Sequence, residues 1–306
     1  MRKIDEPILN LNQEPSSLFS VIKSYVSLTK PRIIELLLVT TVPTMFLASN
    51  GWPDWYLVLA TLIGGALAAG GANALNNVVD RDIDALMDRT AHRPLVTGKV
   101  SVRGAVALGI TLSLSSVIWL VSQVNTLSAL FAASAIVFYV CVYTLLLKRR
   151  TSSNIVWGGA AGCFPVLIGW AAVTNSLSLT AWLFFLVIFF WTPPHFWALA
   201  IKYRDDYAAA GIPMLPVVAS IKSVEKQMWF HTIGMVLASL GVNWSEKLPW
   251  WCWVITVVIA LGFGRELLKI DGPDSNKAAA KLFQWSITYL SVYSLLLVIA
   301  ALVVNP

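Results

Sequence analysis

The chain has 306 residues, of which 57% are hydrophobic and only 12% are charged. This composition is that of a polytopic membrane protein. The formal net charge of +6 concerns membrane topology and anionic lipid, so we expect membrane lipid and no nucleic acid as a partner. The three cysteines have no paired spacing, so no disulfide or zinc framework is indicated.

Nine stretches are apolar and long enough to cross a membrane, because about 20 helical residues span a hydrocarbon core about 30 Å thick. When the nine spans are threaded through a bilayer, every Lys and Arg except Lys247 falls on one side. The positive-inside rule identifies that side as cytoplasmic. We therefore predict an all-α bundle of nine transmembrane helices with a cytoplasmic N-terminus. The predicted spans are 33–49, 57–79, 102–121, 127–147, 154–173, 179–201, 228–243, 250–267 and 283–303.

The predicted cytoplasmic side carries an N-terminal arm and two long loops. Residues 1–30 are polar and lack the apolar core and cleavage site of a secretory signal, so we interpret them as a cytoplasmic arm. Residues 31–306 form a single intramembrane domain. Its long loops cover residues 80–101 and 202–227. The basic residues 148–150 are interpreted as the positive-inside anchor of the fourth span, with a propionate or diphosphate contact as the alternative.

The first of these loops begins with carboxylates at a regular spacing. Asn76, Asp80, Asp84 and Asp88 recur every four residues, so on a continuous helix they lie along one side. Neighbouring like charges at this spacing cost about 0.2–0.5 kcal/mol for each pair on an isolated helix. The cost is larger where lipid lowers the dielectric constant. A cation must therefore offset these charges.

Two interpretations supply that cation. Arg81, Arg89 and Arg93 could form a solvated ion-pair network with the carboxylates. Alternatively, the carboxylates bind Mg²⁺, which usually takes one or two carboxylates and completes its shell with water and substrate phosphate. The arginines then contact the remaining phosphate oxygens. We favour the second interpretation, because it gives the carboxylates and the arginines one shared ligand.

A diphosphate bound at a membrane surface indicates a lipid-like substrate, since an isoprenoid tail can lie in the apolar interior while the charged head stays at the cytoplasmic mouth. Metal and arginines stabilise the charge that develops on a departing diphosphate. The allylic carbon left behind becomes cation-like, and an aromatic pocket can stabilise it. The pattern therefore favours prenyl transfer.

Several segments carry a resemblance to a known family. The run Asn76-x3-Asp80-x3-Asp84, followed by Arg89-Thr90-x2-Arg93-Pro94-Leu95, resembles the first motif of the UbiA-type intramembrane prenyltransferases. Within that superfamily, WTPPHFWALAIKYRDDYAAAGIPMLPVV (residues 191–218) is similar to the protoheme IX farnesyltransferases, also called haem O synthases. The segments TKPRIIELLLVTTVP and LKRRTSSNIVWGG extend the resemblance over nearly the whole chain.

The resemblance implies two acidic motifs that face each other at the cytoplasmic mouth of a nine-helix bundle. The implied catalytic residues lie in both motifs: Asn76, Asp80, Asp84 and Asp206. Metal binding is implied for three of them: Asp80, Asp84 and Asp206. Diphosphate binding is expected from four basic residues: Arg89, Arg93, Lys202 and Arg204. The secondary candidates are Asn73, Asp205 and Tyr207. Many members carry two aspartates four residues apart in the second motif, whereas here they are adjacent and position 202 is Lys.

The implied reaction transfers a farnesyl group from farnesyl diphosphate to a vinyl group of haem b, with addition of water, and gives haem O and diphosphate. Mg²⁺ is the implied cofactor. A terminal oxidase or a haem A synthase is the expected partner that receives the product. The resemblance also implies a multi-pass protein in the cytoplasmic (inner) membrane of a bacterium, with its active site facing the cytoplasm.

His195 follows Pro193 and Pro194 inside the sixth span, where the two prolines should bend or open the helix. An ionisable residue within a membrane is a functional candidate, and an incoming haem can take a histidine ligand. Haem binding and a packing role at the proline kink both remain open. The resemblance favours haem binding.

Two rival functions would use similar residues. A sibling prenyltransferase with a soluble-headed aromatic acceptor would share the first motif, but the segment around His195 argues against it. A secondary transporter for an anionic substrate could also place charges at the mouth of a helical bundle. An odd number of spans, with charges confined to one mouth, argues against alternating access.

Overall fold

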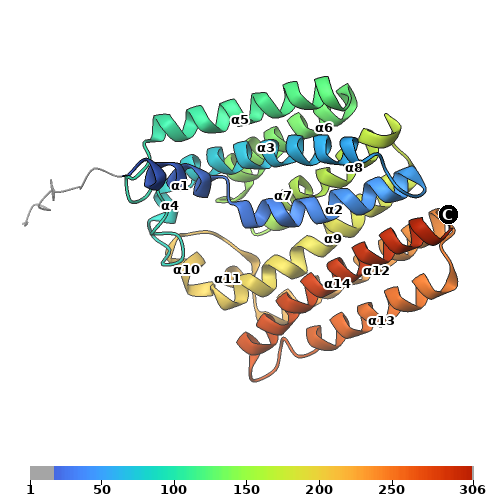
Figure 1. Ribbon diagram of the computed structural model, residues 1–306. Coiled ribbons are helices and arrows are strands. Elements are labelled where there is room, and N and C mark those ends of the chain that lie inside the picture. The colour runs from blue at the N-terminus through green and yellow to red at the C-terminus, as the bar shows by residue number, and fades with distance from the viewer. Residues whose placement is uncertain (1–16, 305–306) are drawn as a thin grey trace, which may run out of the picture.

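Helices make up the regular secondary structure of the described chain, which contains no strand. The computed structural model describes residues 17–304, and the side chains of residues 32–38 and 304 lie outside that description. The long helices run side by side in one bundle (Figure 1). They are α2 (Pro31–Ser49), α3 (Trp55–Val79), α5 (Val102–Gln123), α6 (Thr126–Val137), α8 (Phe164–Thr174), α9 (Leu179–Lys202), α12 (Ile221–Ser245), α13 (Trp250–Leu267) and α14 (Ser275–Val304).

The remaining helices are short, and most of them lie at one end of the bundle. They are α1 (Leu18–Leu28), α4 (Arg81–Asp84), α7 (Asn154–Gly158), α10 (Arg204–Ala209) and α11 (Leu215–Val218). A π-helical segment η1 (Phe138–Leu147) extends α6, and a 3₁₀ turn η2 (Gly159–Cys163) joins α7 to α8. Figure 1 shows α1, α4, α10 and α11 gathered at one end, while the C-terminal end of α14 lies at the other.

Within the described chain, seven helical stretches are long and apolar enough to cross a membrane. They coincide with the predicted second to sixth, eighth and ninth spans, so the protein is an all-α, multi-pass membrane protein. The predicted first and seventh spans are helical too, as α2 and α12. The total of nine spans and the orientation of the termini stay predictions.

Two helices begin well before the predicted membrane spans that they contain. The helix at the seventh span begins at Ile221 rather than at 228, and the last helix begins at Ser275 rather than at 283. The reason is that hydropathy marks membrane depth and not helix length. The Ser220 hydroxyl accepts a hydrogen bond from Ser223 N (3.3 Å) and caps α12 inside a polar stretch, so this helix extends beyond its apolar part.

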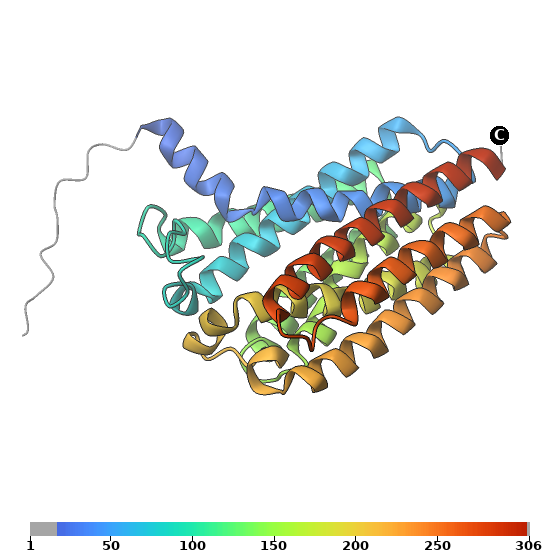
Figure 2. The same ribbon diagram turned by 90° about the horizontal axis from the view of Figure 1, so that it is seen from below.

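Close helix contacts hold the end of α3 that carries the acidic residues. A Cβ added to Gly71 on α3 would lie 2.8 Å from the Gly109 carbonyl oxygen on α5, so these two helices require small residues where they cross. On the other side of the bundle, α14 packs against α2, α9 and α13, as Figure 2 shows from below.

The last residues of the predicted arm dock on α3. Asn77 Nδ2 donates to the Leu28 carbonyl (2.9 Å), and Asn73 Nδ2 donates to the Thr29 carbonyl (3.1 Å). Lys30 follows with a left-handed backbone (φ 53°) and starts α2. Residues 1–16 of the predicted arm lie outside the described residues, and the boundary at residue 30 stays a prediction.

Candidate active site

The acidic residues at the end of α3 are buried rather than solvated. Asn76, Asp80 and Asp84 expose 2%, 0% and 2% of their surface. The amide of Asp80 donates to Asn76 O (2.9 Å) and that of Asp84 to Asp80 O (2.8 Å), which preserves the four-residue spacing. The expectation that Asp88 continues the stripe is wrong. The helix ends at Asp84, and Asp88 is exposed in the following turns, because short carboxylate side chains favour helix ends over helix interiors.

Cations from three separate segments face these buried groups. Lys148 Nζ, at the end of η1, pairs with Asp80 Oδ2. Arg93 Nη1 lies 2.5 Å from Asp84 Oδ2, and Lys30 Nζ donates to Asn76 Oδ1 (2.7 Å). Burying a carboxylate is costly unless a cation and hydrogen bonds compensate for the lost water. The site therefore combines carboxylates and cations in the way that a metal and diphosphate site requires.

One oxygen in this cluster has no partner. Asp80 Oδ2 accepts from Asn76 Nδ2 (2.8 Å) and from Lys148, but the buried Asp80 Oδ1 receives no hydrogen bond from any described residue. Asn76 Nδ2 is also within hydrogen-bonding distance of Thr144 Oγ1 (3.1 Å), so η1 fixes the amide that orients Asp80. A buried, unpartnered carboxylate oxygen is a suitable ligand for a hard cation such as Mg²⁺.

The pKa of Lys30 is shifted by its burial and by the charged residues of the site. Burial lowers the pKa of its ammonium to about 7, and the nearby Arg93 and Lys148 lower it in the same direction, while Asp80 and Asp84 oppose them. An amine that titrates in this range can change its charge when an anion enters the site.

The second acidic loop reaches the first through Arg89. The guanidinium Nη2 of Arg89 donates to the Tyr207 hydroxyl on α10 (2.8 Å). The same guanidinium lies over the Tyr207 ring, 4.9 Å from its centroid, and 5.6 Å from the Tyr203 centroid. Burial raises the pKa of Tyr207, so its hydroxyl stays neutral. Asp206 is next to Tyr207 and half-buried, which places the second motif beside the first.

The other predicted residues of the second loop are less constrained. Lys202, Arg204 and Asp205 are exposed, and no ion pair involves them among the described residues. Lys202 Nζ lies 5.3 Å from the centroid of the Tyr203 ring. Across the described residues, no three His, Cys, Asp or Glu side chains form a metal-binding group. Mg²⁺ does not require such a group, because water and substrate phosphate complete its shell.

His195 is on α9, and its side chain contacts α14. Its ring stacks on Trp191 (centroids 4.2 Å apart) and on Phe283 (4.5 Å), and Nδ1 hydrogen bonds to Ser286 Oγ (2.6 Å). Trp191 Nε1 donates to the Ser286 carbonyl (2.7 Å), which fixes the same contact. With both ring faces covered and Nδ1 engaged, a haem iron could use only Nε2.

Sequence patterns did not place two basic segments, around Lys30 and Lys148, at the candidate site, although both contact it. Two of the residues interpreted as a membrane anchor also form ion pairs, Lys148 with Asp80 and Arg149 with Asp82. The anchor role stays a prediction. Arg150 is exposed and fits the anchor role. Lys30 was assigned only to the arm. The available signal was that both lysines lie in segments, TKPR and LKRR, that carry the family resemblance.

The fold and the site together define a membrane-embedded helical protein with paired carboxylates and cations at one mouth. A family model described as the UbiA prenyltransferase family matches residues 37–288. The chain therefore belongs to the UbiA prenyltransferase family.

Individual known proteins agree with this assignment. A protein of Streptomyces avermitilis named protoheme IX farnesyltransferase is 54% identical over 280 residues, which cover 89% of this chain and 91% of the relative. A solved structure described as digeranylgeranylglyceryl phosphate synthase superposes with a TM-score of 0.74 at 16% identity, covering 92% of this chain and 99% of the other. A UbiA homologue from Archaeoglobus fulgidus, bound to DMAPP and Mg²⁺, superposes with a TM-score of 0.64 at 16% identity, covering 90% of this chain and 99% of the other.

Proposed function

We propose that this protein transfers a farnesyl group from farnesyl diphosphate to a vinyl group of haem b, with addition of water, and releases haem O and diphosphate. The observation that carries the proposal is the buried Asp80 carboxylate: Lys148 pairs with its Oδ2, and its Oδ1 receives no hydrogen bond from any described residue. The name of the 54% identical relative supports the choice of farnesyl and haem as substrates.

Mg²⁺ is the proposed cofactor. Asp80 and Asp84 would hold it, with Asp206 from the second loop as the third proposed ligand. The buried Asp80 Oδ1 and the carboxylates of the cluster fit a hard cation with oxygen ligands. When bound, Mg²⁺ supplies positive charge that stabilises a leaving diphosphate. The description of the Archaeoglobus fulgidus homologue as bound to Mg²⁺ supports this assignment.

The basic residues of the site bind and orient the diphosphate in this proposal. Arg93, Lys148 and Lys30 already point at the cluster and can exchange their carboxylate or amide partners for phosphate oxygens. Arg89, Lys202 and Arg204 bind the diphosphate from the two loops. The developing negative charge on the leaving group then lies within a pre-formed set of donors.

The aromatic residues of η1 are the proposed shield for the allylic cation. Tyr139 and Tyr143 stack with their centroids 5.6 Å apart, and the Tyr139 hydroxyl lies 3.4 Å from Asn73 Oδ1. Asn73 lies one helical turn before Asn76 on α3, and its side-chain oxygen accepts the hydrogen bond that holds the Tyr139 ring in place. The faces of tyrosine rings stabilise cations and keep water away from them. The vinyl carbon of haem then attacks without a strong protein base.

Haem contact through His195 Nε2 is the proposed role of that residue. A titration of haem b into purified protein would test it, because replacement of His195 by Ala should change the absorption spectrum of the bound haem. An unchanged spectrum would leave His195 as a packing residue of the α9 and α14 contact. The product would pass to a terminal oxidase or a haem A synthase, and we propose the cytoplasmic face of the bacterial inner membrane as the location of the site.

The decisive experiment incubates the purified protein with haem b, farnesyl diphosphate and Mg²⁺, and identifies the haem product by mass. We expect a haem that has gained one farnesyl group and one hydroxyl group, with the second proton of the added water released together with diphosphate. Turnover of another aromatic acceptor with no change in haem would contradict the assignment and favour a sibling prenyltransferase.

A further inference from the structure

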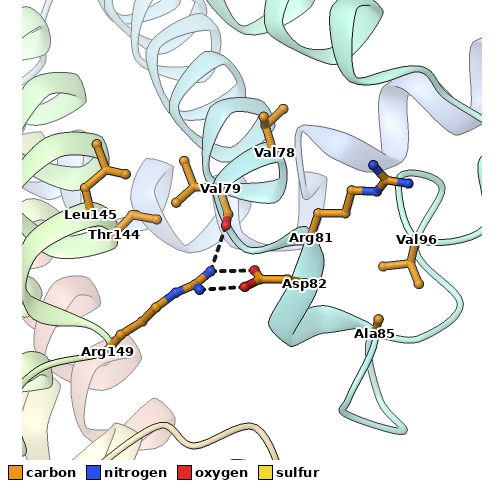
Figure 3. Close-up of a pocket in the computed structure, with 9 residues that line it drawn as sticks. All are labelled: Val78, Val79, Arg81, Asp82, Ala85, Val96, Thr144, Leu145 and Arg149. Carbon is orange, nitrogen blue, oxygen red and sulfur yellow. Dashed lines mark hydrogen bonds and ion pairs between the residues drawn. The ribbon is translucent and has the colours of Figure 1, made fainter.

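A second charged pocket lies on the outer flank of the first motif. It is a cavity of about 670 Å³ between the end of α3, α4 and the end of η1 (Figure 3). Its wall is mostly apolar, and its charged groups are Arg81, Asp82 and Arg149. The apolar lining residues are Val78, Val79, Ala85, Val96 and Leu145, and Thr144 completes the wall.

The charges of this pocket do not cancel. Arg149 makes a two-pronged ion pair with Asp82 (2.6 and 2.7 Å) and also donates to the Val79 carbonyl (2.8 Å), as Figure 3 shows. This pairing lowers the pKa of Asp82, so the carboxylate stays ionised. Arg81 Nε donates to the Leu95 carbonyl (3.2 Å), and none of the described residues forms an ion pair with it. One positive charge therefore remains in the pocket.

The position of the pocket indicates the kind of ligand. Val78, Val79 and Leu145 belong to helices long and apolar enough to cross the membrane, whereas Arg81 and Arg149 come directly after these helices. An apolar wall next to the Arg81 guanidinium, which points away from the Arg149–Asp82 pair in Figure 3, matches a phospholipid, whose acyl chain and phosphate are likewise adjacent. A free phosphate would make no use of the apolar wall. Arginine forks bind phosphate oxygens in pairs, and anionic lipid is attracted to basic residues beside a span.

We propose that this pocket binds the phosphate group of an anionic phospholipid and that the bound lipid fixes the first acidic motif. The pocket and the candidate active site share a wall. Thr144 lines the pocket and is also the partner of Asn76 Nδ2 (3.1 Å). Asp82 lies two residues after the buried Asp80, and Arg149 directly follows Lys148, which pairs with Asp80. A lipid whose phosphate binds Arg81 and whose chain packs beside the Arg149–Asp82 pair would thus contact both segments that carry the pair between Asp80 and Lys148.

The test measures lipid binding, so it does not depend on the proposed reaction. The purified protein is placed in nanodiscs of phosphatidylcholine with or without phosphatidylglycerol, and native mass spectrometry counts the phosphatidylglycerol that stays bound. We expect Arg81→Ala to retain about fivefold less of this lipid than the wild type, as the loss of one basic contact implies. Arg150→Ala is the matched control, because Arg150 is equally exposed and lies outside the pocket. It should retain the lipid like the wild type.

A second variant guards against misfolding. Ala85→Phe adds volume to the exposed lining of the pocket without changing charge, and it should also lose the bound lipid. Equal retention by Arg81→Ala, Ala85→Phe and Arg150→Ala would overturn the proposal. Displacement of the lipid by inorganic phosphate at equal concentration would overturn it too, because it would identify a site for free phosphate.

Discussion

The two acidic regions at the same end of the bundle are built in different ways. In the first, Asp80 and Asp84 are buried and each is paired with a cation. In the second, Asp205 is exposed, Asp206 is half-buried, and neither forms an ion pair among the described residues. Buried carboxylates require fixed partners, whereas exposed ones do not. The first region is therefore ordered in advance of any ligand, and the second contacts it through the hydrogen bond between Arg89 and Tyr207 and through the apolar cluster that contains Tyr207.

The largest expected effect comes from removing a charge in the first region. Asp80→Asn should lower kcat/KM for haem farnesylation by on the order of 10³, because the proposed metal would lose its most buried ligand. Asp88→Asn should be close to the wild type, since Asp88 is exposed outside the paired cluster. If Asp80→Asn folded normally and kept activity within tenfold of the wild type, Asp80 would not be a metal ligand.

Removal of a partner cation tests the pairing itself. Lys148→Met leaves Asp80 buried without its counter-charge, which should lower the unfolding free energy of the metal-free protein by about 3–5 kcal/mol. Part of this loss should return when Mg²⁺ is added, because a cation at the proposed metal site would neutralise the same carboxylate. Thermal unfolding in detergent measures both effects, and Arg150→Met is the control. A variant as stable as the control would show that the ion pair contributes little.

The pH dependence of the unfolding free energy tests the environment of Lys30, because a solvent-exposed lysine would not show a lowered pKa. The folded-state pKa of Lys30 is about 7 and its ordinary value is 10.5. Between these values the unfolded chain holds one more proton than the folded chain, so metal-free stability should rise with pH through this window. Lys30→Met should remove that part of the rise. Identical slopes in thermal melts of the two proteins between pH 7 and pH 10 would contradict the lowered pKa of Lys30.

The smallest effect is expected where the second region attaches to the first. Tyr207→Phe removes the hydrogen bond from Arg89 and should raise the KM for farnesyl diphosphate about tenfold, which is the usual size for a bond to a charged donor. Steady-state kinetics should show little change in kcat. Tyr56→Phe, at the exposed start of α3, is the matched control. A KM equal to that of the control would show that the second region is held in another way.

The part of this architecture that sequence alone could predict is local in character. Most span positions and the buried stripe from Asn76 to Asp84 follow from residue spacing on a helix. The partners of the stripe are not local: Lys148 lies 68 residues from Asp80, and Lys30 lies 46 residues from Asn76. No spacing rule connects such positions, and only the packing of α2, α3 and η1 brings them together. The end of the stripe before Asp88 was also missed, because a helix end there depends on the following turns.

The most direct test of the central claim is to locate the metal. Crystals of the protein soaked with Mn²⁺ and a non-hydrolysable farnesyl diphosphate analogue should show an anomalous peak about 2.0–2.3 Å from Asp80 Oδ1, with the diphosphate beside Arg93 and Lys148. A Mn²⁺ peak and a diphosphate both distant from Asp80 and Asp84, in protein that still turns over haem, would contradict the account.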